Sequence, residues 1–544
     1  MYDYNCPDCN EAKLQSDKNA RKINEVIEQV NALIQVNNET VDFIEEKANE
    51  VVEEIAEIKV NEVLGVIRTE IDDINSSLDN SKQYIDFSLK KYIEGEEIRN
   101  TFFEDKTYNI DFFKLDGGTC FLVGNGKIKT TIKSNSTVEY LQPFQMFNTE
   151  IVTIKDLTFE TPNTTGGESI LLFKDCENIL IENITLITSG GYSLYFENCT
   201  DIFIKGCKLN KGSLWFKNCD NVLIDGNTFK NTFYDSIKAQ GNNFKIINNS
   251  FIGSQADAID CYTNGQNVVI ANNYIENCSV MGIQLKAVIR DNGGVGEGGS
   301  SDTDGYNNRV LVSNNIIKNS PYGVSIKLDD LRINPVNSIE DMSKYIKIIG
   351  NLIENCDRGI YGKHVILIEV TNNTIITSND KAIMFSESFY NCVVSNNLIE
   401  NCKDGVYMVP KSTNLASKNK IENNKISLIN NAGIIYRGGT TTISNNSIEN
   451  VAIGIQAMYS TNNIIKGNSI IGATTVGIDL TGNYNYSILN SNMIVNSVIG
   501  LRINGVNAYS IFTDNIAYNN TTNFVNNSTN TNNSVITNNI NIAI

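Results

Sequence analysis

The stretch Asn248-Asn249-Ser250-Phe251-Ile252 returns about 24 residues later as Asn272-Asn273-Tyr274-Ile275-Glu276. The same Asn-Asn or Gly-Asn pair, followed by short apolar residues, recurs at Asn314-Asn315, Gly350-Asn351, Asn372-Asn373, Asn396-Asn397, Asn423-Asn424, Asn445-Asn446 and Gly467-Asn468. A second signature, a small residue followed by an apolar one, runs in phase with the first, from Ser236-Ile237 to Gly500-Leu501. Together they define a repeat of about 22–24 residues, interrupted by insertions near 287–308 and 329–345.

A repeat of this length, with β-branched strands and no helical period, predicts one turn of a parallel β-helix. Each strand would pair with its equivalent about 4.8 Å away in the next turn. Equivalent Asn side chains would then stack and bond to one another in ladders at the turns. We therefore predict a mainly β fold, with a β-helix over 146–518, a transition and N-terminal cap over 93–145, and a C-terminal cap over 519–544.

The segment 22–92 has a different character, rich in Glu, Lys, Asn, Ile and Val and free of Pro. Apolar residues such as Ile67, Ile71, Ile74 and Leu78 alternate in steps of four and three, as in a heptad seam that only a partner helix can bury. β-Branched residues at both seam positions favour three strands, so we predict a trimeric α-helical coiled-coil stalk and a homotrimer. The alternative is an antiparallel hairpin. The preceding polar peptide, 1–21, would attach the stalk to a larger particle.

The bulk composition excludes several classes of partner. The chain has 544 residues and a net charge of −18, so it offers no continuous cationic surface for nucleic acid. No window approaches about 18 uninterrupted apolar residues, so we expect no membrane insertion. The first residues, 1–13, lack the charged and apolar regions of a secretory signal, and we expect synthesis in a host cytoplasm without one.

The 12 cysteines follow the repeat instead of forming a disulfide framework. Cys176, Cys199 and Cys219 occupy one equivalent position in successive turns, so we expect reduced, buried stacking residues. Cys6 and Cys9 form an isolated Cys-x-x-Cys near the beginning of the chain, which is weak evidence for a metal site or a disulfide between chains.

The segment Asp116-Gly117-Gly118-Thr119-Cys120-Phe121-Leu122-Val123-Gly124 resembles the Gly-Gly-Thr strand with which the pectate-lyase-like β-helices of phage tailspikes open. The resemblance covers roughly 110–520 and is mainly architectural; the short Asp- and Ala-rich helix that usually precedes this strand is missing here. It implies a right-handed, single-stranded β-helix and a virion-borne tailspike or tail fibre that binds host cell-surface polysaccharide. The N-terminal peptide would then bind phage tail or baseplate proteins. A free polysaccharide lyase or glycoside hydrolase and a non-viral surface adhesin are the alternatives.

The strand after the small-apolar signature should present outward columns of side chains, because successive residues point to opposite faces. One column comprises Tyr195, Trp215, Lys238, Asp260, Gln284, Ser325 and Tyr361. A second comprises Glu197, Lys217, Gln240, Tyr262, Lys286, Lys327 and Lys363. Aromatic faces stack on sugars and polar groups bind their hydroxyls. We therefore predict a carbohydrate-binding groove formed by Tyr195, Trp215, Lys238, Tyr262, Gln284, Lys327 and Tyr361. The alternative is that this face is a subunit interface.

The candidate catalytic residues on the same face are Asp235, Asp257, Asp260 and Lys286. In glycoside hydrolysis, carboxylates about 5.5 Å apart suit retention and about 6.5–9.5 Å suit inversion. The carboxylates of Asp235 and Asp257, one turn apart, should have a separation near the range for retention. The carboxylates of Asp257 and Asp260 could reach the range for inversion. This scheme requires no cofactor.

A lyase is the other scheme. Asp257-Ala258-Ile259-Asp260 is similar to the Asp-Gly-Phe-Asp calcium-binding strand of one pectate lyase family. The similarity implies that Asp257 and Asp260 hold calcium and that Lys286 takes the proton α to a uronate carboxylate. Ala256 and Gln284 stand where that family has Asp and Lys, which puts the carry-over in doubt.

Overall fold

The computed structural model describes residues 100–110, 113–126, 130–133, 143–161, 169–188, 191–262, 266–289, 307–330, 342–411, 416–506, 508–530, 535–537 and 540–542. All of them belong to the second of two units, Met1–Leu89 and Lys90–Ile544. The predicted attachment peptide, the coiled coil, and Cys6 and Cys9 lie outside the described residues. The trimer likewise stays a prediction.

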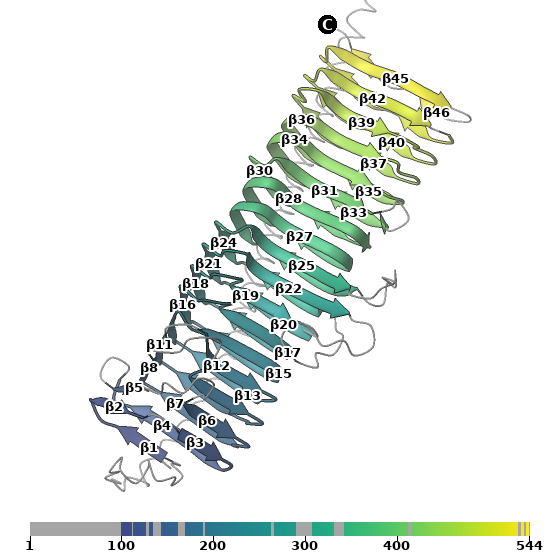
Figure 1. The fold of residues 1–544 in the computed structure, drawn as a ribbon. Helices are drawn as coiled ribbons and strands as arrows, with labels where there is room; N and C mark the ends of the chain where they lie inside the picture. Colours follow the sequence, from purple (N-terminus) through teal and green to yellow (C-terminus); the bar gives the residue numbers. More distant parts are fainter. Residues whose placement is uncertain are drawn as a thin grey trace, which may run out of the picture. The chain divides into compact units, whose positions relative to one another are not determined.

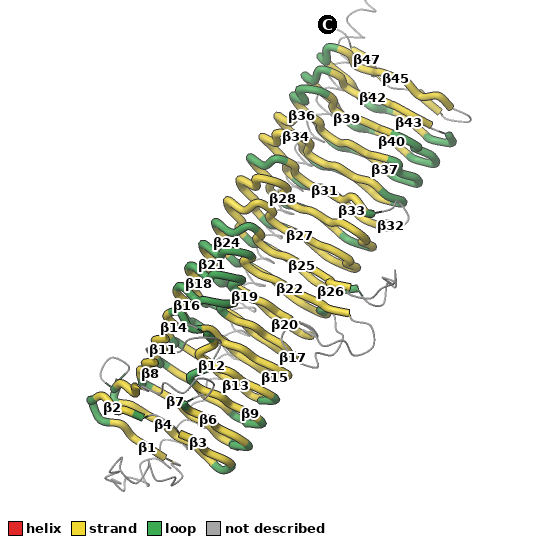
Figure 2. The backbone as a smooth tube through the Cα atoms, viewed as in Figure 1, coloured by secondary structure: helices red, strands yellow, loops and turns green. Residues whose placement is uncertain are grey.

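The second unit is a parallel β-solenoid of about 15 turns (Figure 1). Every strand pairs in parallel with its equivalent in a neighbouring turn, as the repeat predicts. The described backbone consists of strands and loops (Figure 2). Within the same residues there is no helix long and apolar enough to cross a membrane.

The register places the strands in three columns, which we call faces A, B and C. Face A comprises β3 (Phe113–Asp116), β6 (Phe144–Phe147), β9 (Leu171–Lys174), β12 (Tyr192–Glu197), the start of β15 (Ser213–Asp225), the start of β17 (Ile237–Ile247), β19 (Ile259–Tyr262), β22 (Met281–Ile289), β25 (Tyr322–Asp330), the middle of β27 (Leu352–Thr371), the middle of β28 (Thr374–Tyr390), β31 (Asp404–Pro410), the end of β34 (Lys425–Arg437), the end of β36 (Ser447–Met458), β39 (Val476–Thr481), β42 (Ile499–Val506) and β45 (Thr522–Asn530). Face B comprises β1 (Asn100–Phe103), β4 (Thr119–Gly124), β7 (Ile151–Lys155), β10 (Ile179–Glu182), β13 (Thr200–Lys205), the ends of β15, β17 and β27, β20 (Gln266–Ala271), β23 (Asn308–Ser313), β26 (Ser343–Ile349), β29 (Val393–Ser395), β32 (Ala416–Ser417), β33 (Asn419–Glu422), β35 (Thr441–Ser444), β37 (Ile464–Lys466), β40 (Ile488–Asn490), β43 (Ile511–Thr513) and β46 (Val535–Thr537). Face C comprises β2 (Thr107–Asn109), β5 (Thr131–Lys133), β8 (Thr158–Thr161), β11 (Thr185–Thr188), β14 (Lys208–Asn210), β16 (Thr228–Lys230), β18 (Ser250–Ile252), β21 (Tyr274–Glu276), β24 (Ile316–Lys318), β30 (Leu398–Glu400), β38 (Ser469–Ile471), β41 (Met493–Val495), β44 (Ile516–Tyr518), β47 (Ile540–Ile542) and the starts of β27, β28, β34 and β36.

The core lies inside the three faces and is built by stacking like on like. Phe173, Phe196 and Phe216 on face A are fully buried, with successive ring centroids 4.7 and 4.8 Å apart. Burying one such side chain contributes roughly 1.5–3 kcal/mol. On face A, sterics explain why a small residue precedes each apolar core residue. A Cβ on Gly359, for example, would approach the carbonyl oxygen of Ala382 to 2.5 Å.

The Asn-Asn signature builds the corner between faces B and C. The first Asn takes a left-handed backbone conformation, as at Asn396 with φ 55°, which Asn tolerates better than most residues. The second Asn is buried and forms the predicted ladder: Asn373 Nδ2 donates to Asn397 Oδ1 at 3.0 Å, and Asn397 Nδ2 donates to Asn424 Oδ1 at 2.9 Å. Equivalent bonds continue through Asn446, Asn468, Asn492 and Asn515.

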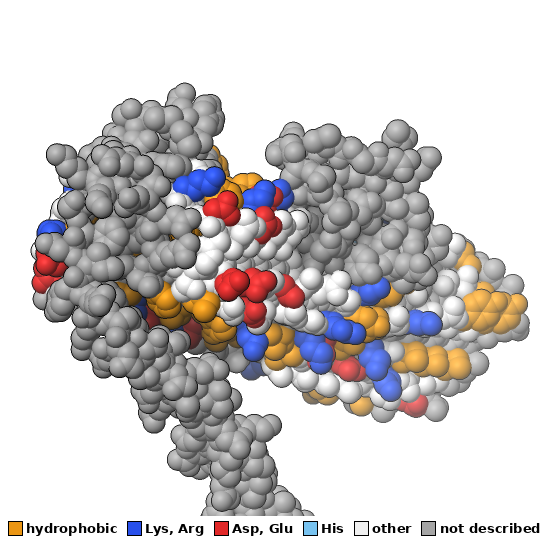
Figure 3. Space-filling view, turned by 90° about the horizontal axis from the view of Figure 1, so that it is seen from below, with side chains coloured by type: hydrophobic (Ala, Val, Ile, Leu, Met, Phe, Trp, Pro, Cys, Tyr) orange, Lys and Arg blue, Asp and Glu red, His pale blue; other side chains and the backbone are white. Residues whose placement is uncertain are grey.

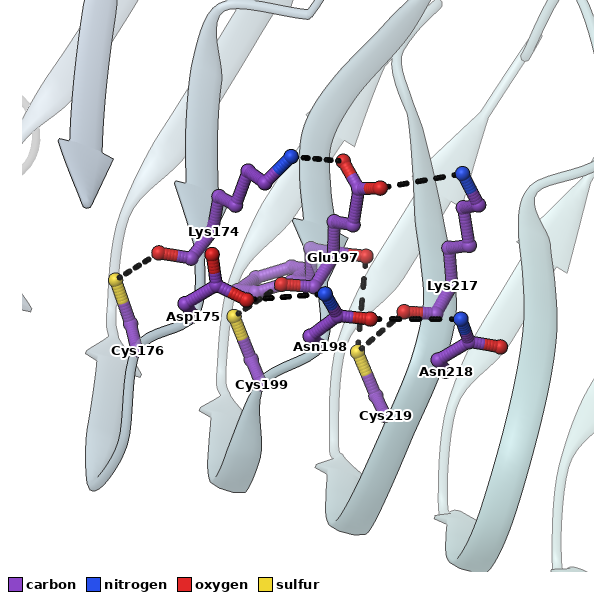
Figure 4. A network of polar contacts seen from close by, with 10 residues as sticks. Lys174, Asp175, Cys176, Glu197, Asn198, Cys199, Lys217, Asn218 and Cys219 are labelled. Carbon is purple, nitrogen blue, oxygen red and sulfur yellow. Dashed lines mark hydrogen bonds and ion pairs between the residues drawn. The ribbon is translucent and has the colours of Figure 1, made fainter. Parts of the chain in front are cut away.

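Side chains also pair from turn to turn at the surface (Figure 4). Glu197 lies between Lys174 and Lys217, with N–O distances of 3.5 and 3.2 Å. Cys176, Cys199 and Cys219 stack in successive turns and are free and buried, as predicted. Every other cysteine in the described part of the chain is also free and buried.

The ladder extends beyond the bounds predicted for the solenoid, 146–518. At one end β1 pairs with β4, and at the other β44 pairs with β47, so 93–145 and 519–544 both contain strands of the same three faces. The Gly-Gly-Thr segment links face A to face B: Gly117 and Gly118 turn with φ 77° and 73° between β3 and β4.

Candidate functional site

The first predicted column on face A exists with the predicted register. Tyr195 pairs with Trp215, Trp215 with Lys238, Lys238 with Asp260, Asp260 with Gln284, Gln284 with Ser325, and Ser325 with Tyr361. An outward direction does not leave every member exposed, however. Asp260 and Gln284 are only 5% and 7% exposed, and Ser325 is fully buried. The column therefore has a buried polar centre between aromatic ends.

Three carboxylates meet at this centre. Asp257 precedes β19 and Asp260 lies within it, while Asp235 precedes the face A part of β17 in the neighbouring turn. The backbone N–H of Asp257 donates to Asp235 Oδ1 at 3.1 Å. Oδ1 of Asp257 and Oδ1 of Asp260 are buried without a hydrogen-bond partner among the described residues. Such orphaned oxygens destabilise a fold unless a proton, water or ligand satisfies them.

The environment shifts the proton affinities of all three groups upward. Burial raises the pKa of Asp257 to about 9, and repulsion from Asp260 and Asp235 adds to the shift. Burial likewise raises the pKa of Asp260 to about 7, helped by Asp235 and opposed by Lys238 and Lys286. Burial raises the pKa of Asp235, while the Asp257 N–H and the same two lysines oppose the rise. At neutral pH the cluster therefore contains both a protonated carboxyl and an ionisable one.

An aromatic group, which we call the tryptophan platform, borders the carboxylates. It consists of Trp215 with Tyr192, Tyr195 and Tyr234. The Trp215 ring lies 4.9 Å from Tyr192 and 4.7 Å from Tyr195, and Tyr192 stacks on Tyr234 at 5.4 Å. Burial and the charges of Asp235 and Asp260 raise the pKa of Tyr192, so its ring lies close to the carboxylates.

This part of the site opens to the surface. Tyr234 is 41% exposed, and Asp235, Lys238 and Lys286 are half-buried. The Lys238 ammonium lies 5.5 Å from the centroid of the Trp215 ring, a cation–π distance. A ligand on this surface could therefore contact Asp235 directly, between an aromatic surface and two cations, whereas Asp257 and Asp260 are each only 5% exposed.

The second predicted column is only partly continuous. Glu197 pairs with Lys217, and Lys286 with Lys327 and then Lys363, but the register shifts after Phe216, so Lys217 does not pair with Gln240. The backbone of Tyr262 pairs with that of Lys286. Gln240 is buried, with 6% of its surface exposed. The centre thus brings together Trp215, Lys238, Asp235, Asp257, Asp260, Gln284 and Lys286, while Lys327 and Tyr361 lie further along face A.

The predicted calcium site at Asp257 and Asp260 stays a prediction. Among the described residues, no three or more His, Cys, Asp or Glu side chains are arranged to hold one metal ion. We derive no step through a metal.

His364, the single histidine of the chain, lies at the turn between faces A and B with φ 53°. Its Nδ1 lies 2.8 Å from Ser388 Oγ, which resembles a base–nucleophile pair. Ser388 is only 1% exposed, so a substrate carbonyl cannot reach it. The pair is structural.

Sequence reasoning missed Tyr192 and Tyr234. Tyr192-Ser193-Leu194-Tyr195 has the same pattern as Asp235-Ser236-Ile237-Lys238, so extending the turn column backward by two turns reaches Tyr192. In the turn between them, the residue that pairs with Tyr192 is the small Ser213, and the Tyr192 ring stacks on Tyr234 one turn beyond it. For Tyr234, the repeat in the sequence contains no pattern that would have singled it out.

Charge is unevenly distributed on the surface. On the face that Figure 3 presents, acidic side chains gather in groups, while Lys and Arg side chains are spread along the unit, some of them next to acidic ones.

The comparisons concern the fold. The sequence matches the family model "Right handed beta helix region" at residues 144–287, 210–338 and 304–448, which together span more than half of the chain. No curated protein matches the sequence.

Several solved structures are similar to this chain. One is the Dettilon tailspike protein, at 11% identity and a TM-score of 0.36, covering 66% of this chain and 62% of that one. The chain thus spans less than two thirds of the length of that tailspike. Another is PfbA, a surface adhesin of Streptococcus pneumoniae, at 14% identity and a TM-score of 0.33, covering 70% and 84%. A third is the catalytic domain of a GH87 α-1,3-glucanase, at 16% identity and a TM-score of 0.38, covering 71% and 66%. Likenesses at this level carry no argument about function. By its family match and its parallel three-faced ladder, the chain belongs to the right-handed β-helix family.

Proposed function

We propose that this protein binds a polysaccharide on face A and hydrolyses its glycosidic bonds with the carboxylates Asp235, Asp257 and Asp260. The observation that carries the proposal is that the tryptophan platform adjoins three carboxylates with raised pKa values, the buried Asp257 and Asp260 and the half-buried Asp235. Aromatic rings next to carboxylates of unequal proton affinity are what oxocarbenium chemistry requires: a surface for the sugar and an acid–base pair.

The roles follow from the proton affinities. Asp257, with its pKa raised to about 9, keeps its proton at neutral pH and acts as the general acid on the leaving oxygen. Asp260, with a pKa of about 7, and Asp235 are the candidates for the base or nucleophile. Lys238 and Lys286 favour the ionised forms of both residues and so help to keep one carboxylate charged.

The biological setting that we propose is a trimeric phage tailspike that recognises host cell-surface polysaccharide. Two sequence features support it: the Gly-Gly-Thr opening at Asp116–Thr119 and the heptad pattern over 22–92. In this setting the N-terminal peptide would bind tail or baseplate proteins, and the spike would act in the virion.

The test is incubation of the purified protein with cell-wall and capsular polysaccharides, followed by chromatography of fragment size and ultraviolet absorbance of unsaturated uronate ends. Shortened chains without unsaturated ends, lost in Asp257→Asn, are the expected result. Shortened chains with unsaturated ends would identify a lyase and overturn the hydrolytic roles. Tight binding without shortening would leave a receptor-binding protein with no catalytic activity.

A further inference from the structure

Face A has a second aromatic group, several turns beyond the carboxylates, which we call the tyrosine platform. It is formed by Tyr322, Tyr361, Tyr407, Arg358, Lys381 and Asp380. All six side chains are partly exposed. Tyr361 continues the column that contains Trp215 and Asp260, and Tyr407 follows it two steps later, through Met384.

The platform is held rigid by its own charges. The Arg358 guanidinium lies 5.3 Å from the ring centroids of both Tyr322 and Tyr361, and its Nη1 donates to the Tyr322 hydroxyl at 3.0 Å. Lys381 lies 4.8 Å from the Tyr407 centroid. Asp380 joins the two cations, 2.9 Å from Arg358 Nε and 2.6 Å from Lys381 Nζ. A preorganised aromatic surface loses little conformational entropy on binding.

The register sets its distance from the carboxylates. Asp260, Gln284, Ser325 and Tyr361 are successive partners, so Tyr361 lies three turns from Asp260, or roughly 14 Å. In the other direction Trp215 lies two turns from Asp260, or roughly 10 Å. The carboxylates are therefore flanked on both sides by aromatic side chains on one line parallel to the solenoid axis.

The floor between the two platforms also lacks internal partners. Ser325 Oγ, like Oδ1 of Asp257 and Oδ1 of Asp260, is buried without a hydrogen-bond partner among the described residues. Asp257 and Asp260 lie in one turn and Ser325 lies two turns further on, all of them between the aromatic ends.

We propose that a polysaccharide lies along the solenoid axis, bound by the tryptophan platform on one side of the carboxylates and by the tyrosine platform on the other, so that cleavage is internal. The inference rests on the proposed hydrolytic function. From Trp215 to Tyr407 the column spans seven turns, roughly 34 Å, which several sugar residues are needed to fill. The ligand class is a linear polysaccharide with an extended chain, and short oligosaccharides would reach only one platform.

The experiment compares a polysaccharide that the wild-type protein shortens with a short oligosaccharide from the same polymer, in Tyr361→Ala and Tyr407→Ala. The KM for the polymer should rise on the order of tenfold in the double variant, as expected for the loss of aromatic contacts. Turnover of the short oligosaccharide and kcat on the polymer should not change. In the wild type, viscosity should fall before reducing ends accumulate. Tyr274→Ala on face C is the matched control. It should change neither the KM for the polymer nor the turnover of the short oligosaccharide.

Two outcomes would overturn the inference: an equal loss on long and short substrates, or wild-type-like polymer kinetics in the double variant. Release of only terminal sugars would do the same. A separate measurement, polymer binding by Asp257→Asn with and without the tyrosine changes, does not depend on cleavage. If the wild type shortens nothing, the proposed hydrolysis fails, and this binding comparison still decides whether the tyrosine platform holds the polymer.

Discussion

The backbone N–H of Asp257 donates a 3.1 Å hydrogen bond to Oδ1 of Asp235 across one turn of the solenoid. Stacked repeats bring these two residues together, although 22 positions separate them in the chain. The bond fixes Asp235 beside a second carboxyl whose pKa is raised to about 9. Two carboxyls locked next to each other cannot both ionise easily, and this constraint makes the pair testable.

The pH dependence of activity should be bell-shaped. Activity should rise as the carboxylate that ionises near pH 7 loses its proton, and it should fall near pH 9 as Asp257 loses the proton that it donates. The two limbs belong to the coupled cluster more than to single residues. The measurement is kcat/KM on a cleaved polysaccharide between pH 5 and 10. A rate that stays constant through pH 9 would remove Asp257 as the acid.

Asp257→Asn should abolish cleavage and yet stabilise the fold at alkaline pH. Because the pKa of Asp257 is higher in the folded state than in the unfolded state, the folded state binds the extra proton between about pH 4 and 9. Stability from this group is therefore complete at low pH and is lost as the pH rises. The amide has no proton to lose, so the thermal midpoint of the variant should exceed that of the wild type by a few degrees at pH 9 and match it near pH 4. A lower midpoint at pH 9 would contradict the raised pKa.

Trp215→Ala should weaken polysaccharide binding by about 1 kcal/mol, or roughly fivefold, if the ring supports a sugar. Phe203→Ala is a matched control, because Phe203 is a comparable aromatic residue, 42% exposed, on face B. Titration calorimetry with a bound oligosaccharide would measure both. Unchanged affinity in Trp215→Ala, with reduced self-association, would assign face A to a subunit interface.

Asn397→Ala should destabilise the solenoid by about 1–3 kcal/mol, because it leaves the buried partners of the ladder unsatisfied. Its side chain donates to the Val370 carbonyl and to Asn424, and it accepts from Asn373. The adjacent change Asn396→Gly should be nearly neutral, since Asn396 is exposed and its φ of 55° suits glycine. Denaturant unfolding of the two variants measures the difference. Equal losses would mean that the corner, and not the ladder, carries the stability.

Deletion of residues 1–92 should weaken or abolish trimerisation, because the heptad pattern that predicts the trimer lies in that segment. Light scattering on the truncated and full chains measures the number of chains in each assembly and so tests this prediction. A stable trimer of the truncated chain would transfer the role to the β-helix.

The sequence by itself determined the architecture, because in a parallel solenoid one local rule is repeated. The Asn-Asn pair specifies a left-handed turn followed by a ladder residue, and the small-apolar pair specifies close packing of neighbouring turns. The columns on face A follow from counting in steps of two, and the structure reproduces the register of the first column from Tyr195 to Tyr361, whereas a register shift after Phe216 interrupts the second. Free, buried cysteines follow from the same stacking.

Only the tertiary structure decided what the site is. Alternation along a strand says that Asp260 faces outward, but neighbouring side chains in adjacent turns decide that it is 5% exposed and that its pKa is raised. The contact of Tyr192 with Tyr234 spans the turn in which Ser213 pairs with Tyr192, and the cations over Tyr322, Tyr361 and Tyr407 depend on side-chain directions. Burial, charge coupling and ring contact are properties of several turns at once. A repeat sets the spacing of these groups, and only their packing sets their energies.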